Sequence, residues 1–193
     1  AFRSASLPNC RSPRDKRHGS LFHFHTTGGS TLACDTFLKI DGIPGESTDD
    51  KHKGEIEVLS FSWGAHSTGS IGSGTTGGGV GKAVFSDFTF SKKVDLASPK
   101  LALVAANGGH IATAKYSIRK AGGEAGQVDY QTYEMEKLYV TGIAVSVGQD
   151  GECYETLTLA PTKFKWKYSQ QDDKGALSGN AVVTVDRAKN TAV

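Results

Sequence analysis

Four glutamates in strand-like segments near the C-terminus are the first candidates for chemistry in this sequence. They are Glu134, Glu136, Glu152 and Glu155. Two carboxylates can act as general acid and base when the fold holds both of them around one substrate atom. In strands of an antiparallel sheet, however, polar residues that alternate with apolar ones usually form the solvated face. We therefore interpret the four glutamates as outward-facing surface charges.

Nucleophiles and metal ligands give weaker signals. Cys153 lies in the middle of a strand-like segment, and no Gly-Ser-Gly nucleophile elbow precedes a helix-like segment. His23 and His25 would share one face of an extended segment and could bind a metal, but no second ligand pair follows at a recognisable spacing. We expect no catalytic residue, no metal site and no cofactor, and the sequence does not support an enzyme.

The glycine-rich segment 64–81 contains two partial nucleotide-binding motifs. Gly72, Gly74 and Gly77 match G-x-G-x-x-G, but a strand pattern follows where the dinucleotide fingerprint needs the start of a helix. Gly81-Lys82 matches the end of a P-loop, yet Thr76 replaces its first glycine and Ala83 replaces the magnesium-binding Ser or Thr. Neither motif predicts a nucleotide site.

Three lysines at alternate positions, Lys163, Lys165 and Lys167, form a basic stripe opposite Phe164, Trp166 and Tyr168. Such a stripe could bind an anion. A solvated or subunit-facing strand face is the favoured interpretation, because antiparallel sheets commonly present one polar face.

Charge and cysteine content exclude several classes of protein. Residues 1–34 hold five basic residues and one acidic residue, a net charge of +4; since the whole chain carries +2, the remainder carries −2. The remainder therefore lacks the Lys/Arg cluster of a nucleic-acid-binding domain. Three scattered cysteines do not form a disulfide framework and are expected to be free thiols. No apolar run is long enough for a membrane span or for a Sec signal peptide.

The elements that must position any site are mostly strands. Strand patterns cover residues 37–40, 55–63, 84–90, 111–120, 128–147, 152–169 and 180–187, with Val84, Phe88 and Phe90 expected on one face. Phase slips near Val58-Leu59 and Lys137-Leu138 suggest bulges, and Pro161 suggests a bend. One helix is expected, with Ser98 as N-cap, an apolar stripe at Leu101, Val104 and Ala105, and a stop at 107–109.

Within these strands, side-chain alternation predicts which residues are buried. Leu59, Phe61 and Trp63 are expected on one face of their strand, with Ser60 and Ser62 on the other. Ala114, Tyr116 and Ile118 are expected to face the core, and Lys115, Ser117 and Arg119 to face solvent.

About seven strands and one short helix predict a mainly β fold, an antiparallel β-barrel or two-sheet sandwich with a flanking helix. Three regions are expected: a disordered or non-native leader (1–34), the β-domain (35–187) and a C-terminal tail (188–193).

Several runs resemble the haemolysin-coregulated (Hcp) family, the tube subunits of bacterial type VI secretion systems. They are DTFLKIDGIPGES (35–47), Lys51-His52, EIEVLSFSWG (55–64), the glycine-rich segment into GKAV (81–84), AKYSIRKAGGE (114–124), LTL (157–159) and FKWKY (164–168). The resemblance covers residues 35–187 and implies a β-barrel that forms hexameric rings, which stack into an exported tube. It also implies a spike protein, a sheath and effectors as partners, and secretion from the bacterial cytoplasm without a Sec signal peptide.

Two surface hypotheses follow from the resemblance. Ser60 and Ser62 would face the lumen and offer cargo a smooth wall, although an ordinary exposed strand face explains them equally well. The segment 64–81 would be a mobile arm that contacts the next ring through Gly64, His66, Ser70, Gly74, Gly78 and Val80. The alternative to a tube subunit is a monomeric β-sandwich binding module of the adhesin or carbohydrate-binding type.

Overall fold

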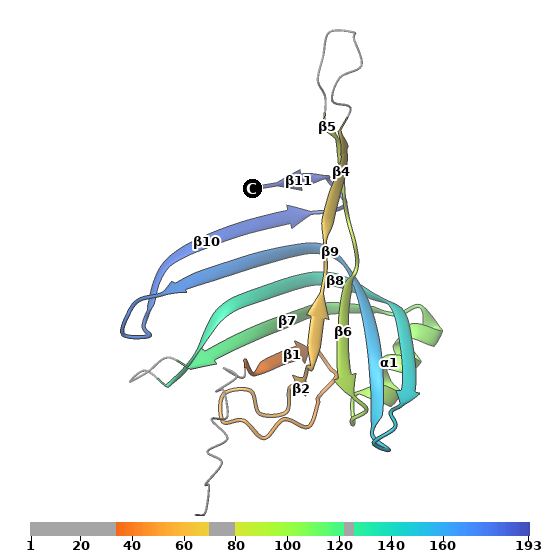
Figure 1. Ribbon diagram of the computed structural model, residues 1–193. Coiled ribbons are helices and arrows are strands. Elements are labelled where there is room, and N and C mark those ends of the chain that lie inside the picture. Colours follow the sequence, from red (N-terminus) through yellow and green to blue (C-terminus); the bar gives the residue numbers. More distant parts are fainter. Residues whose placement is uncertain (1–33, 70–79, 122–125) are drawn as a thin grey trace, which may run out of the picture. The chain divides into compact units, whose positions relative to one another are not determined.

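A computed structural model describes residues 34–69, 80–121 and 126–193. The chain divides into the units Ala1–Thr31 and Leu32–Val193, and every described residue belongs to the second unit. The described part holds eleven strands and one helix (Figure 1). In chain order they are β1 (Thr36–Ile40), β2 (Ile56–Glu57), β3 (Ser60–Ser62), β4 (Ala65–Gly69), β5 (Val80–Phe85), β6 (Phe88–Lys93), α1 (Ser98–Asn107), β7 (His110–Ala121), β8 (Gln127–Val147), β9 (Cys153–Gln171), β10 (Leu177–Asp186) and β11 (Thr191–Ala192).

Nine of the strands form one antiparallel sheet that bends into two layers. The first layer follows the order β11-β10-β9-β8-β7-β1-β2, and the second pairs β3 with β6 and β6 with β9. The long strands β8 and β9 belong to both layers, because the C-terminal half of β9 pairs with β10 and its N-terminal half pairs with β6. The predicted mainly β class with one short helix is confirmed. Among the described strands the sheet is not closed into a barrel, and its two layers fit the sandwich form of the prediction.

The bend between the layers lies where the sequence predicts irregularity. Lys137 has a positive φ of 50°, which non-glycine residues rarely adopt. The register between β8 and β9 shifts between Val140 and Gly142, and Pro161 pairs with Leu138 beside this shift. The two long strands therefore turn together from one layer into the other.

Aromatic side chains fill the space between the layers. Phe88 and Phe90 of β6 are fully buried, and their rings lie 5.1 Å from Phe164 and 5.2 Å from Tyr116, respectively, on the facing layer. Phe61 of β3 packs against the same cluster. Burying one such ring stabilises the fold by roughly 1.5–3 kcal/mol, so this cluster is a main source of stability.

The segment from Ile56 to Trp63 changes its hydrogen-bonding partner, and this change alters which residues are buried. The Val58 N–H bonds to Thr36 of β1, whereas the Leu59 N–H bonds to Ser91 of β6. Val58 is buried, and the expectation that Leu59 is buried is wrong, because its side chain is 57% exposed. The irregularity predicted at this point is real, and beyond it the inward positions are Phe61 and Trp63.

Helix α1 begins one residue away from the expected cap. Ala97 is the N-cap, and the expected Ser98 cap is wrong because the Ser98 side chain bonds to Lys92 and Asp95 instead. The Asp95 carboxylate accepts the Ala97 N–H at 3.0 Å. The predicted stop is confirmed, since Gly108 closes the helix with a left-handed φ of 62°.

Three further expectations need correction. Val84 does not share a face with Phe88, because β5 ends at Phe85 and Val84 is 52% exposed. The expected long loop 64–81 is interrupted by β4 and β5, and residues 70–79 lie outside the described part. The expected tail after 187 contains β11, which pairs with β10.

Candidate assembly surfaces

A buried polar network connects the loop before β2 to strands β7 and β8. The imidazole of His52 lies between two carboxylates, with Nδ1 2.7 Å from Glu55 Oε2 and Nε2 3.3 Å from Asp129 Oδ1. Arg119 Nη1 donates to Asp49 Oδ2 at 2.8 Å. Arg119 is only 3% exposed, so the expectation that it faces solvent is wrong. Ser117 is buried as well. The network fixes the loop before β2.

Asp49 is held as a carboxylate by its surroundings. Backbone N–H groups of Lys51 and His52 and the guanidinium of Arg119 lower the pKa of the Asp49 carboxyl below its usual value, and the Lys51 N–H has the largest effect. Hydrogen bonds to the charged form favour that form. Asp49 therefore acts as an anionic anchor for the loop.

A second buried network overturns the expected position of Glu155. Glu155 and Lys92 are fully buried at the end of the core row on β9 and β6, with Lys92 Nζ 3.3 Å from Glu155 Oε1. The ammonium of Lys92 donates to Asp95, Ser98 and the Lys93 carbonyl, so Glu155 is left with a charge partner and no hydrogen bond. The ion pair anchors the turn that precedes α1.

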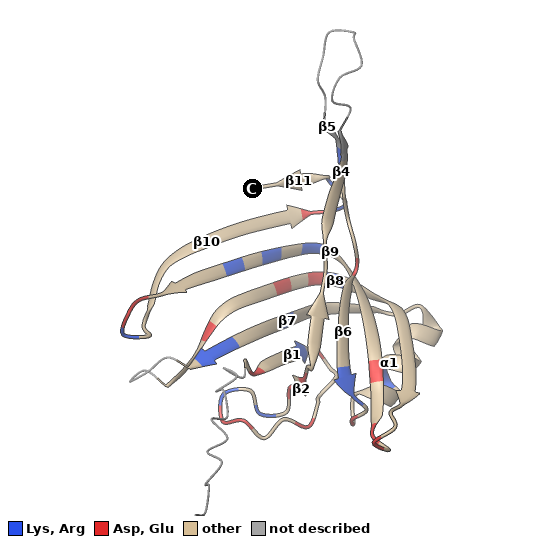
Figure 2. Cartoon of the chain, in the orientation of Figure 1, with Lys and Arg blue, Asp and Glu red and all other residues tan. Residues whose placement is uncertain are grey.

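The other three glutamates are exposed, as predicted: Glu134 and Glu136 lie on β8, and Glu152 lies in the turn directly before β9. Glu136 pairs with Lys163 at 3.1 Å and Glu134 with Lys165 at 3.6 Å, across β8 and β9. Figure 2 shows these acidic and basic bands side by side on the two strands. Glu152 pairs with Lys93. Because each carboxylate faces an ammonium group, the arrangement resembles a solvated charge ladder and not an acid–base pair.

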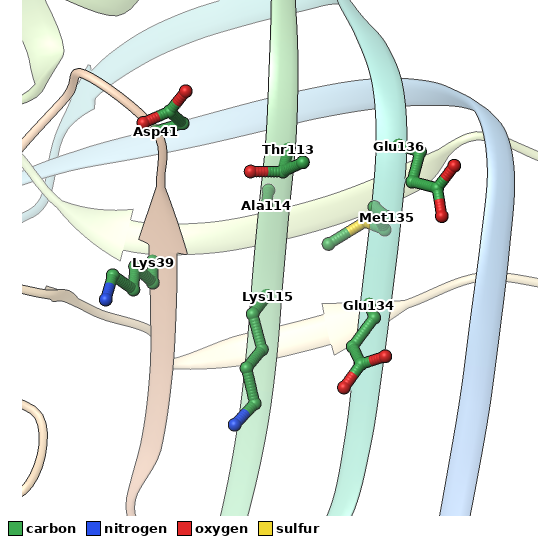
Figure 3. A pocket seen from close by; sticks show the side chains of 8 residues that line it. All are labelled: Lys39, Asp41, Thr113, Ala114, Lys115, Glu134, Met135 and Glu136. Atoms are coloured by element: carbon green, nitrogen blue, oxygen red, sulfur yellow. The ribbon is translucent and has the colours of Figure 1, made fainter.

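A pocket of about 380 Å³ lies beside this ladder, over β1, β7 and β8 (Figure 3). Lys39 and Lys115, which are register partners, form one side, and Glu134 and Glu136 form the other. Thr113 contributes the only hydroxyl among its lining side chains. No histidine or cysteine lines this pocket, and its two sides carry opposite charges.

Small hydroxyl side chains occupy the outward positions of the second layer. Ser60 pairs with Ser91, and Ser91 pairs with Thr156; Ser62 pairs with Thr89, and Thr89 pairs with Thr158. Direct register partners share one face of a sheet. We call this surface the hydroxyl face; it consists of Ser60, Ser62, Thr89, Ser91, Thr156 and Thr158. Alternation in the sequence predicted that Ser60 and Ser62 share one face. The other four residues join this face only through the pairing of β3, β6 and β9.

Strands β4 and β5 form a separate two-stranded ribbon. Of the residues expected to contact a neighbouring ring, Gly64 lies at the base of the ribbon, His66 is exposed on β4 and Val80 begins β5. Ser70, Gly74 and Gly78 lie outside the described residues, as does the G-x-G-x-x-G match. Gly81 and Lys82 belong to β5, so the P-loop-like pair precedes no helix.

Two tyrosines of the core show how strongly it excludes water. Burial raises the pKa of Tyr116 to about 12. Burial also raises the pKa of Tyr133, although its hydroxyl accepts hydrogen bonds from Trp63 Nε1 at 3.2 Å and Gln131 Nε2 at 2.7 Å. Both hydroxyls serve the packing of the core.

Within residues 34–69, 80–121 and 126–193, no group of three His, Cys, Asp or Glu side chains is arranged to hold a metal ion. Cys34 and Cys153 are free and exposed, whereas Cys10, His23 and His25 lie outside the described residues. Among the described elements, α1 is the one helix, and its 10 residues are too few to span a membrane.

Comparisons with known proteins agree on one family. The family described as "Type VI secretion system effector, Hcp" matches residues 37–168. Protein hcp1 of Pseudomonas aeruginosa is 38% identical over 153 residues, which cover 78% of this chain and 93% of that protein. A solved structure of a type six secretion system protein superposes with a TM-score of 0.77 at 34% identity, covering 83% of this chain and 100% of its own. Hcp1 from Salmonella typhimurium gives a TM-score of 0.68, also at 34% identity, covering 84% of this chain and 100% of its own.

Proposed function

This chain belongs to the Hcp family of type VI secretion proteins, and from that membership we propose that it is a structural subunit of the secretion tube. The subunits assemble into hexameric rings, the rings stack, and the lumen carries effectors. The rings form in the bacterial cytoplasm and leave the cell through the secretion system together with a spike protein, inside a sheath. We assign no catalytic step, nucleic-acid partner or membrane insertion to this subunit.

The hydroxyl face is the observation that carries this proposal. A tube wall must let cargo pass without trapping it, so it should lack aromatic and long charged side chains. The six Ser and Thr residues of the hydroxyl face meet this requirement across three neighbouring strands. We assign Ser60 and Ser62, both exposed, to the lumen.

The exposed charges of β7, β8 and β9 (Lys115, Glu134, Glu136, Lys163 and Lys165) offer a means of joining subunits. Lysines and glutamates alternate across β7, β8 and β9, and such mixed surfaces favour one register between neighbours through complementary charges. A closed ring is a natural outcome when one face of a subunit contacts a different face of the next.

Size and shape in solution test the assembly. On gel filtration the purified chain should elute as a ring, far from the position of a 20.4 kDa monomer, and negative-stain microscopy should show rings or tubes. Elution as a monomer would contradict the proposal and favour the alternative, a β-sandwich binding module of the adhesin or carbohydrate-binding type.

Residue Ser62 tests the lumen assignment. We expect Ser62→Gln to leave the rings intact and to reduce retention of co-expressed effectors, because the longer amide side chain narrows and roughens the wall. Ser178→Gln, an exposed serine on β10, is the matched control and should retain effectors like the unaltered chain. Equal retention by both variants would remove Ser62 from the lumen.

The β4–β5 ribbon is proposed as the contact between stacked rings, through Gly64, His66 and Val80 together with Ser70, Gly74 and Gly78. Deleting residues 66–79 should leave single rings and abolish tubes. Tubes of unchanged length after the deletion would refute this role.

A further inference from the structure

The ribbon is the continuation of the β3–β6 pair, interrupted by a bulge. Ser62 pairs with Thr89 in the sheet, and Ala65 pairs with Phe85 in the ribbon. Between these pairs one strand has two residues, 63 and 64, and the other has three, 86 to 88. One extra residue on one strand is the definition of a β-bulge, which bends a ribbon and increases its twist. The direction of the ribbon is therefore set at residues 86–88.

A ribbon of two strands cannot hold its own direction. β4 and β5 pair only with each other, and an isolated pair of strands is marginally stable in water. Gly64 and Ser86 connect the two strands at the base, where the Ser86 N–H bonds to the Gly64 carbonyl at 2.8 Å and Ser86 Oγ accepts the Gly64 N–H at 2.7 Å. These bonds hold the strands together without fixing the ribbon to the sheet.

Arg187 joins the bulge to the sheet through four polar contacts, beside the Phe85 ring, which packs against Phe164 at 5.9 Å. Its Nη2 donates to the Phe85 carbonyl at 3.2 Å and lies 3.1 Å from Asp87 Oδ1, on the two sides of Ser86. Its Nη1 donates to the Pro161 carbonyl at 3.2 Å, and its backbone N–H donates to Thr162 at 2.9 Å. One guanidinium thus binds the end of the ribbon, the bulge and the bend of β9.

Asp87 is held from a second side. Its Oδ2 accepts the Thr141 hydroxyl at 2.9 Å, close to the register shift of β8. Arg187 and Asp87 are 25% and 29% exposed, respectively, so their ion pair is partly shielded from water and stronger than a fully exposed one. The fork of a guanidinium suits this geometry, because it presents several donors in one plane.

We propose that Arg187 is a positioning residue that locks the bulge at Asp87 and thereby fixes the direction of the β4–β5 ribbon relative to the sheet. Since Arg187 directly follows β10, the lock also couples the ribbon to the C-terminal end of the sheet. The partner whose contact depends on the direction of the ribbon is a second copy of the chain in the next ring. This identification of the partner rests on the proposed function.

Distance measurements between spin labels test the lock without any reference to rings. The full chain, with its three cysteines replaced by serine, would carry nitroxides at Lys82→Cys on β5 and Lys115→Cys on β7, both exposed positions. Labelled protein is diluted into an excess of unlabelled protein, so that only distances within one subunit are measured. We expect a narrow distribution of label-to-label distances in the unaltered chain. Arg187→Ala should broaden it about twofold or more, because the ribbon is then free to adopt several orientations relative to the sheet.

Two variants separate positioning from general destabilisation. Arg187→Lys keeps the charge opposite Asp87 and should restore a narrower distribution than Arg187→Ala. Lys189→Ala removes an exposed lysine two residues after Arg187, whose Nζ lies 4.0 Å from Asp186 Oδ2, and should not change the distance distribution. Circular dichroism should show the same strand content in all variants. An unchanged distribution in Arg187→Ala would overturn the proposal.

Microscopy of the Arg187 variants without spin labels separates the lock at Arg187 from the inter-ring role of the ribbon. Fewer and shorter tubes from intact rings in Arg187→Ala would support both the lock and the inter-ring role of the ribbon. A broadened distance distribution with tubes of normal length would support the lock and refute the inter-ring role.

Discussion

Phe88 and Phe90 of β6 pack between the two layers. In contrast, β4 and β5 pair only with each other among the described strands, and Phe85 at the end of β5 is their contact with the core. Phe88 is fully buried between layers, while Val84, four residues earlier on the same stretch of chain, is 52% exposed. The bulge at residues 86–88 separates these two environments. The difference teaches that one continuous pair of strands can supply stability at one end and a free surface at the other.

The largest contrast should come from truncating a side chain on each side of the bulge. Phe88→Ala removes a ring that packs against Trp63, Tyr133 and Phe164, and should lower the free energy of unfolding by about 3–5 kcal/mol. Val84→Ala on the ribbon should change it by less than about 0.5 kcal/mol. Urea unfolding measures both, and Phe88→Leu is the milder variant if Phe88→Ala does not fold. Similar losses of unfolding free energy at both positions would contradict the distinction between a packed core at Phe88 and an exposed ribbon at Val84.

Breaking a buried ion pair should cost more stability than breaking an exposed one, just as Phe88→Ala should cost more than Val84→Ala. Lys92→Met leaves Glu155 and Asp95 without their ammonium partner and should cost roughly 3 kcal/mol, since an uncompensated buried charge is strongly destabilising. Replacing Glu155 by Met as well should recover part of that loss. Lys163→Met breaks the exposed pair with Glu136 and should cost less than about 1 kcal/mol. A Lys92→Met variant as stable as Lys163→Met would show that water reaches the pair.

The pH dependence of the unfolding free energy at alkaline pH should show that water is excluded from the Tyr116 hydroxyl. Because burial raises the pKa of Tyr116 from 10.0 to about 12, the folded state keeps a proton that the unfolded state loses. The stabilisation is therefore complete below pH 10 and is lost between about pH 10 and 12, by about 2–3 kcal/mol. Tyr116→Phe should remove this part of the pH dependence of the unfolding free energy. An equal dependence in both proteins would assign it to other groups.

The smallest effect on stability is expected on the ribbon itself. His66→Ala should leave the unfolding free energy within about 0.5 kcal/mol of the unaltered chain, because the side chain is exposed. If the ribbon contacts the next ring, the same change should shorten tubes seen by negative stain. A large loss of stability would instead place His66 inside a packed structure.

Local periodicity was enough for most of the fold. The main strands, the stop of α1 at Gly108 and the irregularities near Leu59 and Lys137 were visible in sequence, because each depends on neighbouring residues along one strand or helix. The exposed serines Ser60 and Ser62 were predicted for the same reason. Their roles in a lumen, like those of the ribbon residues, stay predictions.

Burial was misjudged where a strand changes its neighbours. Leu59 faces solvent because the chain passes from β1 to β6 at that residue. Glu155 and Arg119 were assigned to solvent because they are charged, although Glu155 is in phase with the buried Leu157 and Leu159. Each finds partners from distant segments that make burial tolerable: Lys92 for Glu155, and Asp49 with Asp129 for Arg119. No pattern within a single strand contains that information.

The sequence by itself determined the fold class, the main strands, the helix and the likeness to the Hcp family, because these depend on side-chain periodicity and on short runs of residues. The tertiary structure alone decided which charges are buried, how six hydroxyl residues join into one face, and how Arg187 meets Asp87 across a hundred residues of chain. Such features arise from pairing between strands that are far apart in sequence, and pairing is a property of the folded sheet.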